Sequence, residues 1–437
     1  MNNRREFASL ASSAASRAQN VPLQSGPGRA NGNIHPLEKE LLRKTLDLIG
    51  FLPVCFVLWD GQEVAPSTAP PVARILVRDR DALLRMIANP DLQFGEMYSA
   101  GRIEVEGSLL EVVEALYRAR SSAAPGGLRR ALLNWTNHPR PNSMLHAREN
   151  IHHHYDIGND FYRLWLDEQM IYTCAYFPNA AATLEQAQIA KMDHVCRKLE
   201  LKPGDRVVEA GCGWGALALH MAKHYGAAVR AYNIAKEQLA YARERARREG
   251  LDTRVEYIEG DFREIEAECD AFVSVGMLEH VGVAHYQALG AVINRCLAAN
   301  GRGLIHSIGM NRPSPLNPWI ERHIFPGACP PSLGEMMRIF EPANFSILDV
   351  ENLRLHYART LEHWLQRFEA AVPQVTDMFG VSFVRLWRLY LAGSLGAFST
   401  GELQLFQVVF ARAGDNDIPW TRDYLYPRDA HRDDGKL

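Results

Sequence analysis

Two polar residues in apolar surroundings, Glu279 and His306, have the side-chain types best suited to chemistry in this chain. Glu279 comes shortly after the predicted strand 271–275, and His306 lies inside the next predicted strand, 303–308. A single histidine in an apolar strand is more often a core residue than a functional one. Neighbouring strands would nevertheless bring this carboxyl and imidazole together, and buried polar groups need partners. We therefore expect one buried polar site here.

The second informative stretch is R-V-V-E-A-G-C-G-W-G at residues 206–215, which predicts a strand, a turn and then a helix over 216–224. Glycines allow positive φ angles and a close approach to a ligand, and here they are Gly211, Gly213 and Gly215. The spacing departs from the pyrophosphate fingerprint G-x-G-x-x-G. The preceding Glu209 would repel a pyrophosphate but suits the sulfonium and ammonium of S-adenosylmethionine. The sequence therefore favours methyl transfer over hydride transfer, with a simple tight turn as the alternative.

Polar and aromatic residues also follow the next two predicted strands. Asn233 and Gln238 come after the strand 228–232, and Asp261 and Phe262 come after the strand 255–259. A polar side chain in the first place can bind a ribose, while an acid and a ring in the second can hold an adenine. Each residue alone also fits a helix N-cap or a loop. Together they favour an adenosyl pocket.

An alternating series of strands and helices must position these residues. The predicted strands are 206–210, 228–232, 255–259, 271–275, 303–308, 345–350 and 403–412. Strands that alternate with helices predict an α/β fold with a doubly wound, mostly parallel, Rossmann-like sheet. Ligands of such sheets bind at the carboxyl ends of the strands, where the candidate residues lie.

The chain before this sheet divides into three predicted parts. Residues 1–36 lack periodicity and predict a disordered leader. Residues 37–118 predict a small α+β domain associated with lipid or membrane, with helices at 38–50, 81–89 and 109–118, strands at 54–59 and 72–77, and a glycine-punctuated turn at 94–107. Residues 119–150 predict a linker whose segment 128–135 is an amphipathic helix, either on a membrane surface or packed on a neighbour. The catalytic domain is predicted over 151–437.

Composition excludes several classes of protein. A net charge of −3 over 437 residues disfavours a general nucleic-acid binder. The seven cysteines show no C-x-x-C pair and no metal-ligand spacing, so neither a zinc site nor a disulfide framework is expected. No apolar run approaches the ~20 residues needed to span a bilayer. We therefore expect a cytoplasmic protein whose contact with the inner face of the membrane is peripheral.

Several motifs in a fixed order resemble the cyclopropane fatty acid synthase family, which includes the mycolic acid cyclopropane synthases. The resemblance extends over nearly the whole chain from about residue 37. Its motifs are G-E-x-Y-x-x-G-x-I-x-V-x-G at 95–107, H-Y-D-I-G-N-D-F-Y at 154–162, Y-T-C-A-Y at 172–176, G-C-G-W-G at 211–215, S-V-G-M-L-E-H-V-G at 274–282, H-S-I-G at 306–309 and W-I-E-R-H-I-F-P-G-A-C-P-P-S at 319–332.

This resemblance implies a reaction and two sets of residues. The family uses S-adenosylmethionine to add a methylene across the cis double bond of an acyl chain, usually in a membrane phospholipid. Its bicarbonate site corresponds here to Cys174, Glu279, His306, Ile308 and Tyr357. Its cofactor site corresponds to Tyr172, Thr173, Gly211, Gly213, Asn233, Gln238, Asp261 and Phe262. Bicarbonate would act as a mild base in ring closure, and Cys174 is not expected to be a nucleophile.

The chain departs from the family pattern at two places. The usual Thr-x-Ser after the second strand is Asn233-Ile-Ala235, and the usual cysteine in the stretch 390–398 is Ser394. Ser394 leaves the product open, because a methyl-branched or exomethylene chain is an alternative to the ring. A catalytically silent protein that binds the cofactor or lipid is a second alternative. Homodimerisation also stays open.

Two further expectations concern the acyl chain. Aromatic faces can stabilise a developing carbocation, a role predicted for Tyr162, Tyr172, Phe325 and Tyr390, with packing as the alternative. The insertion 311–344 is rich in apolar residues and is predicted to cover an acyl channel, again with packing as the alternative.

Overall fold

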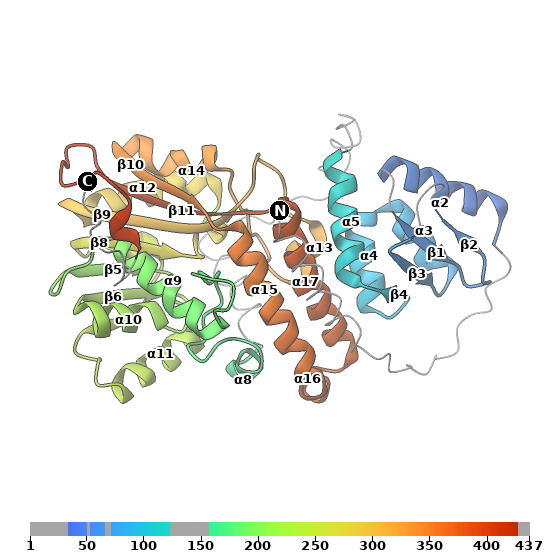
Figure 1. Cartoon of the computed structure of the whole chain (residues 1–437), viewed down its shortest axis with the longest axis horizontal. Helices are drawn as coiled ribbons and strands as arrows, with labels where there is room; N and C mark the ends of the chain where they lie inside the picture. The colour runs from blue at the N-terminus through green and yellow to red at the C-terminus, as the bar shows by residue number, and fades with distance from the viewer. Residues whose placement is uncertain (1–33, 50–52, 66–70, 123–156, 427–437) are drawn as a thin grey trace, which may run out of the picture. The chain divides into compact units, whose positions relative to one another are not determined.

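A computed structural model describes residues 34–49, 53–65, 71–122 and 157–426, which fall into two compact units (Figure 1). The larger unit consists of Pro139–Leu316, His323–Thr360 and Leu403–Leu437. The smaller unit consists of Met1–His138, Asn317–Arg322 and Leu361–Glu402. The chain therefore leaves the larger unit twice after entering it. The predicted domain boundaries do not include these two returns, and they stay a prediction.

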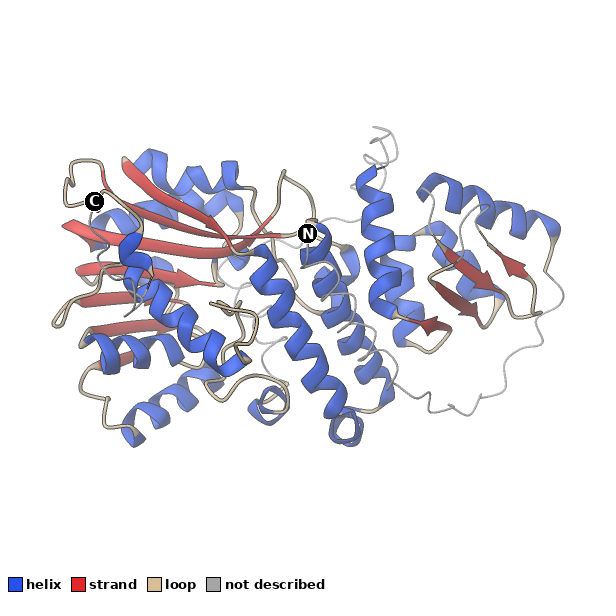
Figure 2. Ribbon diagram, viewed as in Figure 1, coloured by secondary structure: helices blue, strands red, loops and turns tan. Residues whose placement is uncertain are grey.

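The larger unit is built on a seven-stranded sheet with the order β10-β11-β9-β8-β5-β6-β7 (Figure 2). Its strands are β5 (Arg206–Ala210), β6 (Ala228–Asn233), β7 (Val255–Glu259), β8 (Cys269–Val275), β9 (Leu297–Gly309), β10 (Phe345–Asn352) and β11 (Gln404–Arg412). The five strands β5 to β9 pair in parallel, and β11 runs antiparallel to both of its neighbours. The predicted α/β class and mostly parallel, doubly wound sheet are confirmed.

Helices cover both faces of this sheet. They are α8 (Asn159–Arg163), α9 (Leu184–Lys198), α10 (Ala216–Tyr225), α11 (Lys236–Arg248), α12 (Tyr286–Cys296), α14 (Leu333–Phe340) and the beginning of α15 (Arg354–Ala370), with short 3-10 turns η1 (Phe262–Glu264), η2 (Leu278–His280), η3 (Val283–His285), η4 (Glu341–Ala343) and η5 (Asp423–Leu425). Alternate residues of a strand face opposite sides. Val207 accordingly packs in one core with α9, α10 and α11, while Val208 packs in a second core with α12 and α14.

The smaller unit has a four-stranded sheet with the order β2-β1-β3-β4. Its strands are β1 (Val54–Val57), β2 (Glu63–Val64), β3 (Ala73–Val77) and β4 (Ile103–Gly107), and its helices are α2 (Pro36–Ile49), α3 (Arg80–Ala88), α4 (Pro90–Ser99), α5 (Leu109–Ser122), α13 (Pro318–His323, which ends in the larger unit), α16 (Val372–Phe379), α17 (Val381–Thr400) and the end of α15. Helix α17 packs against α4 and α5. Its buried Arg385 donates to the carbonyl oxygens of Tyr98 and Ile103 over 2.5 and 2.8 Å.

One local prediction was wrong. The stretch 94–107, expected to be a turn, contains most of helix α4 and then strand β4. Helix α4 begins with Pro90 after the Asn89 cap and continues through Gly95. A Cβ at Gly95 would lie 2.5 Å from the Trp319 ring, so this glycine provides space for close packing inside the helix. The predicted helix at 128–135 and nearly all of the predicted leader lie outside the described residues.

Part of the insertion 311–344, which was predicted to cover an acyl channel, belongs to the core of the larger unit. Met336, Ile339 and Phe340 of α14 are fully buried in the core shared with α12, so packing accounts for these three side chains. The channel stays a prediction for the rest of the insertion.

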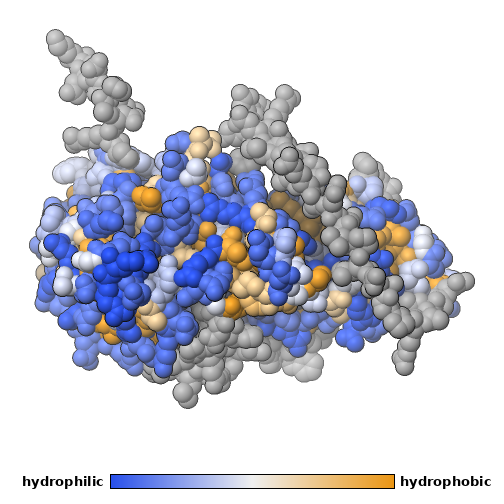
Figure 3. All heavy atoms as spheres, turned by 90° about the horizontal axis from the view of Figure 1, so that it is seen from below, coloured by the Kyte–Doolittle hydropathy of each residue, from blue (hydrophilic) through white to orange (hydrophobic). Residues whose placement is uncertain are grey.

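No helix in the described ranges is long and apolar enough to cross a membrane. On the face drawn in Figure 3, hydrophilic residues make up most of the coloured surface, and hydrophobic residues form smaller patches among them.

Candidate functional site

Glu279 and His306 lie on neighbouring strands at one edge of the large sheet. Glu279 is in η2, directly after β8, and His306 is near the end of β9. Val275 of β8 is paired with His306, and the Gly276 amide donates to the His306 carbonyl oxygen over 2.9 Å. The carboxyl ends of the parallel strands meet at this edge, where doubly wound sheets bind ligands. The structure therefore brings the two residues to one edge, as their strand positions predicted.

The Glu279 carboxyl group is buried and only partly bonded. Its Oε1 accepts the Ile308 amide at 2.5 Å, whereas its Oε2 has no partner in the described part of the chain. Burial raises the pKa of Glu279 to about 7, although hydrogen bonds from backbone amides and from Ser307 oppose the rise. The amide of Ile308, one of the predicted bicarbonate-site positions, binds Glu279 and fixes the direction of the carboxylate. The role of Ile308 toward bicarbonate stays a prediction.

The His306 imidazole is buried as well, with one nitrogen bonded and the other not. Nδ1 accepts a hydrogen bond from Gln407 Nε2 at 3.0 Å, while Nε2 has no partner among the residues described. Burial lowers the pKa of His306 well below its ordinary value, and the positive charges of Lys191 and Lys198 lower it further. The imidazole is therefore neutral near pH 7.

Cys174 and Tyr357 come from two segments that are bonded to each other. Ala175 donates its amide to Thr360 Oγ1 over 3.0 Å, and Phe177 donates its amide to His356 Nδ1 over 2.9 Å. These partners belong to the first turns of α15, which also carry the buried Tyr357. Burial raises the pKa of the Cys174 thiol well above its ordinary value, which argues against a thiolate nucleophile.

The glycine turn after β5 has the conformation that its sequence requires. Gly211, Gly213 and Gly215 have φ angles of 86°, 52° and 83°. A Cβ at Gly215 would collide with the Tyr257 ring, so this glycine packs the turn against β7, whereas no described atom lies within 4 Å of a Cβ at Gly213. The middle glycine is therefore the one where the backbone is left open to a ligand.

Two of the predicted cofactor residues meet beside this open glycine. Asn233 Nδ2 donates to the Gly213 carbonyl oxygen at 3.3 Å and to Gln238 Oε1 at 2.9 Å. Asn233 Oδ1 accepts hydrogen bonds from the amides of Ile234 and Ala235. Asp261 caps η1 and pairs with Arg263, and Phe262 beside it is buried.

The loop residues Tyr172 and Thr173 pack near the ends of the strands, close to Gly276 and to the glycine turn. A Cβ at Gly276, which follows β8, would lie 2.8 Å from Thr173 Cγ2. The Tyr172 ring packs 5.5 Å from the Tyr162 ring, which in turn packs 5.0 Å from Trp214 of the glycine turn. Two of the four aromatic residues predicted to stabilise a cation are therefore neighbours.

The other two aromatic residues are placed differently. Phe325 packs against His280, with ring centroids 5.8 Å apart. Tyr390 and the departure at Ser394 belong to α17, in the smaller unit, where Tyr390 packs against Trp387. Their predicted roles stay predictions.

Glu209 has a different set of contacts from the one its sequence position suggested. It is buried on the face of the sheet covered by α9 and α10, where it interacts with the charge of Lys191 and accepts the Ala218 amide. Burial raises the pKa of Glu209 and lowers that of Lys191, and each charge partly offsets the shift of the other. Glu209 thus joins strand β5 to the start of α10, and its predicted attraction for a cationic ligand stays a prediction.

Three polar residues of the site region were missed from the sequence. Lys191 Nζ donates to Thr173 Oγ1 over 2.9 Å, and Gln188 Nε2 donates to the Thr173 carbonyl oxygen over 3.0 Å. Both occupy core-facing positions of α9, seven and four residues after the buried Leu184. Gln407 is the third. Polar residues at apolar positions of a helix or strand were the available signal.

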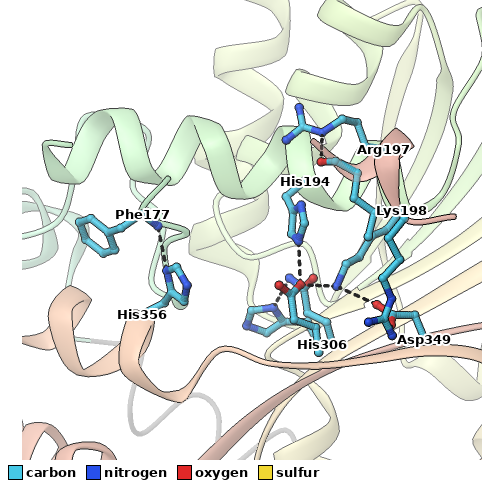
Figure 4. A network of polar contacts seen from close by, with 11 residues as sticks. Phe177, His194, Arg197, Lys198, His306, Asp349 and His356 are labelled. Atoms are coloured by element: carbon cyan, nitrogen blue, oxygen red, sulfur yellow. Dashed lines mark hydrogen bonds and ion pairs between the residues drawn. The ribbon is translucent and has the colours of Figure 1, made fainter. Parts of the chain in front are cut away.

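A separate polar network lies on the same face of the sheet (Figure 4). Glu351 Oε2 of β10 contacts His194 Nε2 at 2.7 Å and Lys198 Nζ at 2.6 Å, both from α9. Lys198 also lies 3.7 Å from Asp349, which pairs with Arg422. In this network two carboxylates face two cations.

The sheet topology, the open glycine turn and the polar edge together define an S-adenosylmethionine-dependent methyltransferase. Residues 142–408 match the family model described as mycolic acid cyclopropane synthetase, and residues 40–126 match a domain of unknown function. Because the first match spans more than half of the chain, the protein belongs to the mycolic acid cyclopropane synthetase family.

Individual relatives agree with this assignment. A probable fatty acid methyltransferase of Pseudomonas putida is 36% identical over 86% of this chain and 96% of its own length. The cyclopropane-fatty-acyl-phospholipid synthase of Escherichia coli K12 is 42% identical over 62% of this chain and 69% of its own. The crystal structure of mycolic acid cyclopropane synthase CmaA1 in complex with SAH and CTAB is 29% identical, with a TM-score of 0.57, over 60% of this chain and 97% of that chain.

Proposed function

We propose that this enzyme transfers a methyl group from S-adenosylmethionine to the cis double bond of an unsaturated acyl chain in a membrane phospholipid, and then closes a cyclopropane ring. The observation that carries the proposal is that two buried atoms at this sheet edge, Glu279 Oε2 and His306 Nε2, both have no partner among the described residues. Buried polar atoms normally have partners, so two at one sheet edge favour a ligand between them. The Escherichia coli relative, a cyclopropane-fatty-acyl-phospholipid synthase, supports the choice of substrate.

The residues at this edge fit a small oxyanion that carries one proton. A carboxylate oxygen can accept its O–H group, and an imidazole nitrogen can bind one of its other oxygens. Bound bicarbonate would supply a weakly nucleophilic base for the proton lost during ring closure. Glu279 and His306 would hold it, together with Tyr357 and the segment around Cys174. Ile308 would contribute by orienting Glu279.

The predicted cofactor residues fit S-adenosylmethionine at the glycine turn. Bound there, it would supply an electrophilic methyl group on its sulfonium. The open backbone at Gly213, with Asn233 and Gln238 beside it, supports a ribose or amino-acid contact. Asp261 and Phe262 would hold the adenine, and Tyr172 and Thr173 would cover the cofactor from the loop.

The remaining task of the protein is to orient the alkene and exclude water. An alkene is a weak nucleophile with no proton to remove, so its alignment supplies much of the rate enhancement. Tyr162, Tyr172 and Trp214 form one aromatic group whose faces would stabilise a developing positive charge without attacking it.

A second product is favoured by a specific observation. The Pseudomonas putida relative matches 96% of its own length and is a probable fatty acid methyltransferase. Acyl C-methylation without ring closure would give a methyl-branched or exomethylene chain, and Ser394 leaves this outcome open. In either case we propose that the protein acts at the inner face of the membrane as a peripheral, cytoplasmic enzyme, with homodimerisation still to be measured.

The test uses the purified full chain with ¹³C-methyl S-adenosylmethionine and vesicles containing a cis-unsaturated phospholipid. We expect labelled acyl chains that have gained one methylene by mass spectrometry. Proton NMR then separates a cyclopropane from an exomethylene isomer. Vesicles of fully saturated phospholipid are the matched control and should take up no label. A folded protein that binds the cofactor but labels neither lipid would favour the catalytically silent alternative.

A further inference from the structure

Gln407 occupies a central place in the polar layer beside the candidate site. It is fully buried on β11, where it is paired with Glu351 of β10 on one side and with His306 of β9 on the other. The three side chains therefore form a row across three strands, on the face covered by α9. Figure 4 shows His306 from this row near the contacts made by His194 and Lys198.

The contact between Gln407 and His306 determines where the imidazole carries its proton. The side-chain nitrogen of a glutamine has hydrogens and no lone pair available as an acceptor. Gln407 Nε2 lies 3.0 Å from His306 Nδ1, and with the amide in this orientation Nδ1 is the acceptor of the hydrogen bond. A neutral imidazole has one N–H group, so its hydrogen is then on Nε2.

The surroundings of His306 keep the ring neutral. The charged groups that face it are Lys191 and Lys198 of α9 and Glu351 of β10, and its burial is complete. Burial and the two lysines disfavour an imidazolium, and the single carboxylate does not compensate, since it also bonds to Lys198 and His194. The unbonded Nε2 is the nitrogen left for a ligand in the described structure.

We propose that Gln407 is a positioning residue that holds His306 as the neutral, Nε2-protonated tautomer, so that the site presents a fixed N–H donor at the sheet edge that also carries the Glu279 carboxyl group. This inference rests on the proposed function for its catalytic consequence, although the tautomer itself does not depend on the substrate. A fixed donor and a carboxylate acceptor would bind a singly protonated oxyanion in one orientation. The opposite tautomer would turn a lone pair toward the anion.

The direct test is the ¹⁵N NMR spectrum of His306 in the cofactor-free full chain, labelled at its 16 histidines. The His306 signals are assigned by their loss in His306→Asn. We expect a pyrrole-like Nε2 and a pyridine-like Nδ1 at neutral pH. A protonated Nδ1, an even mixture of tautomers or an imidazolium would overturn the inference, whatever the enzyme methylates.

Variants of Gln407 then connect the tautomer to turnover. Gln407→Glu places an acceptor opposite Nδ1 and should move the proton to that nitrogen, while Gln407→Leu should release the ring into a mixture. In Gln407→Leu we expect kcat to fall about 10- to 100-fold, the loss that follows removal of the orienting partner of a metal-bound histidine, with the KM for S-adenosylmethionine nearly unchanged. Full activity of Gln407→Leu despite a changed spectrum would overturn the positioning role.

The matched control is Gln404→Leu on the same strand. Gln404 is also buried, but its Oε1 accepts from Asn352 Nδ2 at 2.9 Å. This variant should leave the His306 spectrum unchanged, and a spectrum that shifts as much as in Gln407→Leu would count against a specific role for Gln407. The NMR spectrum and the lipid-labelling assay can also disagree. If His306 shows the expected tautomer but the protein labels no lipid, the inference about Gln407 stands and only the proposed function is rejected.

Discussion

Two glutamates of the larger unit, the buried Glu279 and the partly exposed Glu351, have opposite electrostatic environments. Glu351 contacts Lys198 and His194, and these interactions outweigh the effect of burial and lower its pKa to about 2. Glu279 has hydrogen bonds from amides and a hydroxyl but no neighbouring cation that affects it, and burial raises its pKa to about 7.

These different environments indicate different roles: the residues around Glu351 stabilise the fold, and the residues around Glu279 form the candidate site. The charges around Glu351 are matched within the protein and join β10 to α9, and the atom of this network without a partner in the described residues is a single nitrogen, His194 Nδ1. The Glu279 edge has one carboxylate oxygen and one imidazole nitrogen unpartnered within the described residues. Buried polar atoms without partners cost free energy, and a protein retains that cost where a ligand repays it.

The largest effect is expected from Glu279→Gln. The substitution keeps the shape of the side chain but removes the acceptor that would hold the bicarbonate base, so we predict a loss of turnover of at least about 100-fold, the usual contribution of acid–base catalysis. Cofactor binding, measured by calorimetry with S-adenosylmethionine, should be retained, because the cofactor residues lie at other strand ends. Loss of both activities would instead indicate that Glu279 is structural.

Glu351→Gln should act on stability rather than on chemistry. It leaves the fully buried Lys198 with Asp349 at 3.7 Å, and Arg422 already binds Asp349. Removing the partner of a buried charge such as that of Lys198 is costly, so we predict a fall of about 3 kcal/mol in the free energy of unfolding, measured with urea. The control Glu256→Gln breaks an exposed pair with Arg230 and should cost less than about 1 kcal/mol. Equal losses in the two variants would contradict the comparison.

The strands of the large sheet could be predicted from the sequence because each strand is marked by a local pattern of residues. The bounds of β5 and β7 agree with the predicted 206–210 and 255–259, since each is a short apolar run between turns. Adjacent placement of Glu279 and His306 also followed, because a parallel α/β sheet brings consecutive strand ends to one edge. Helix α4 was missed because Gly95 was interpreted as a turn residue, whereas it makes room for the distant Trp319.

The partners within the site could not be predicted in the same way. Gln407 reaches His306 across 101 positions of sequence, through a pairing of β11 with β9 that no local pattern specifies. Arg385 likewise binds carbonyl groups more than 280 residues earlier, which places α17 in the smaller unit. Polar residues in apolar positions mark such contacts in the sequence, but they do not identify the partner.

The two glutamates should also give opposite pH dependences of stability. The folded pKa of Glu351, about 2, lies below the ordinary glutamate pKa of 4.5, so its contribution to stability is present above about pH 4.5 and is lost as the pH falls toward 2. The folded pKa of Glu279, about 7, lies above 4.5, so its contribution is present below about pH 4.5 and is lost as the pH rises through 7.

Thermal unfolding of the two glutamine variants across this pH range measures the contrast. Relative to the natural protein, Glu279→Gln should gain stability as the pH rises from about 4.5 to above 7, because glutamine carries no charge to bury. The deficit of Glu351→Gln should shrink as the pH falls below about 4.5. Parallel curves for the two variants would show that the environments of these carboxyl groups do not differ as described.

The smallest effect is expected from Ser394→Cys, which restores the residue that the family commonly carries. Ser394 lies on α17, outside the unit that contains both glutamates, so we expect total methyl transfer and both pH dependences to change little. If Ser394 influences the fate of the carbocation, the ratio of ring to branched or exomethylene product should move toward the ring, measured by proton NMR of the extracted lipid. Ser399→Cys, on the same helix, is the control and should leave the ratio unchanged. A fall in total turnover with an unchanged ratio would assign Ser394 to packing, and the choice of product would then have to be made by residues around Glu279 and His306.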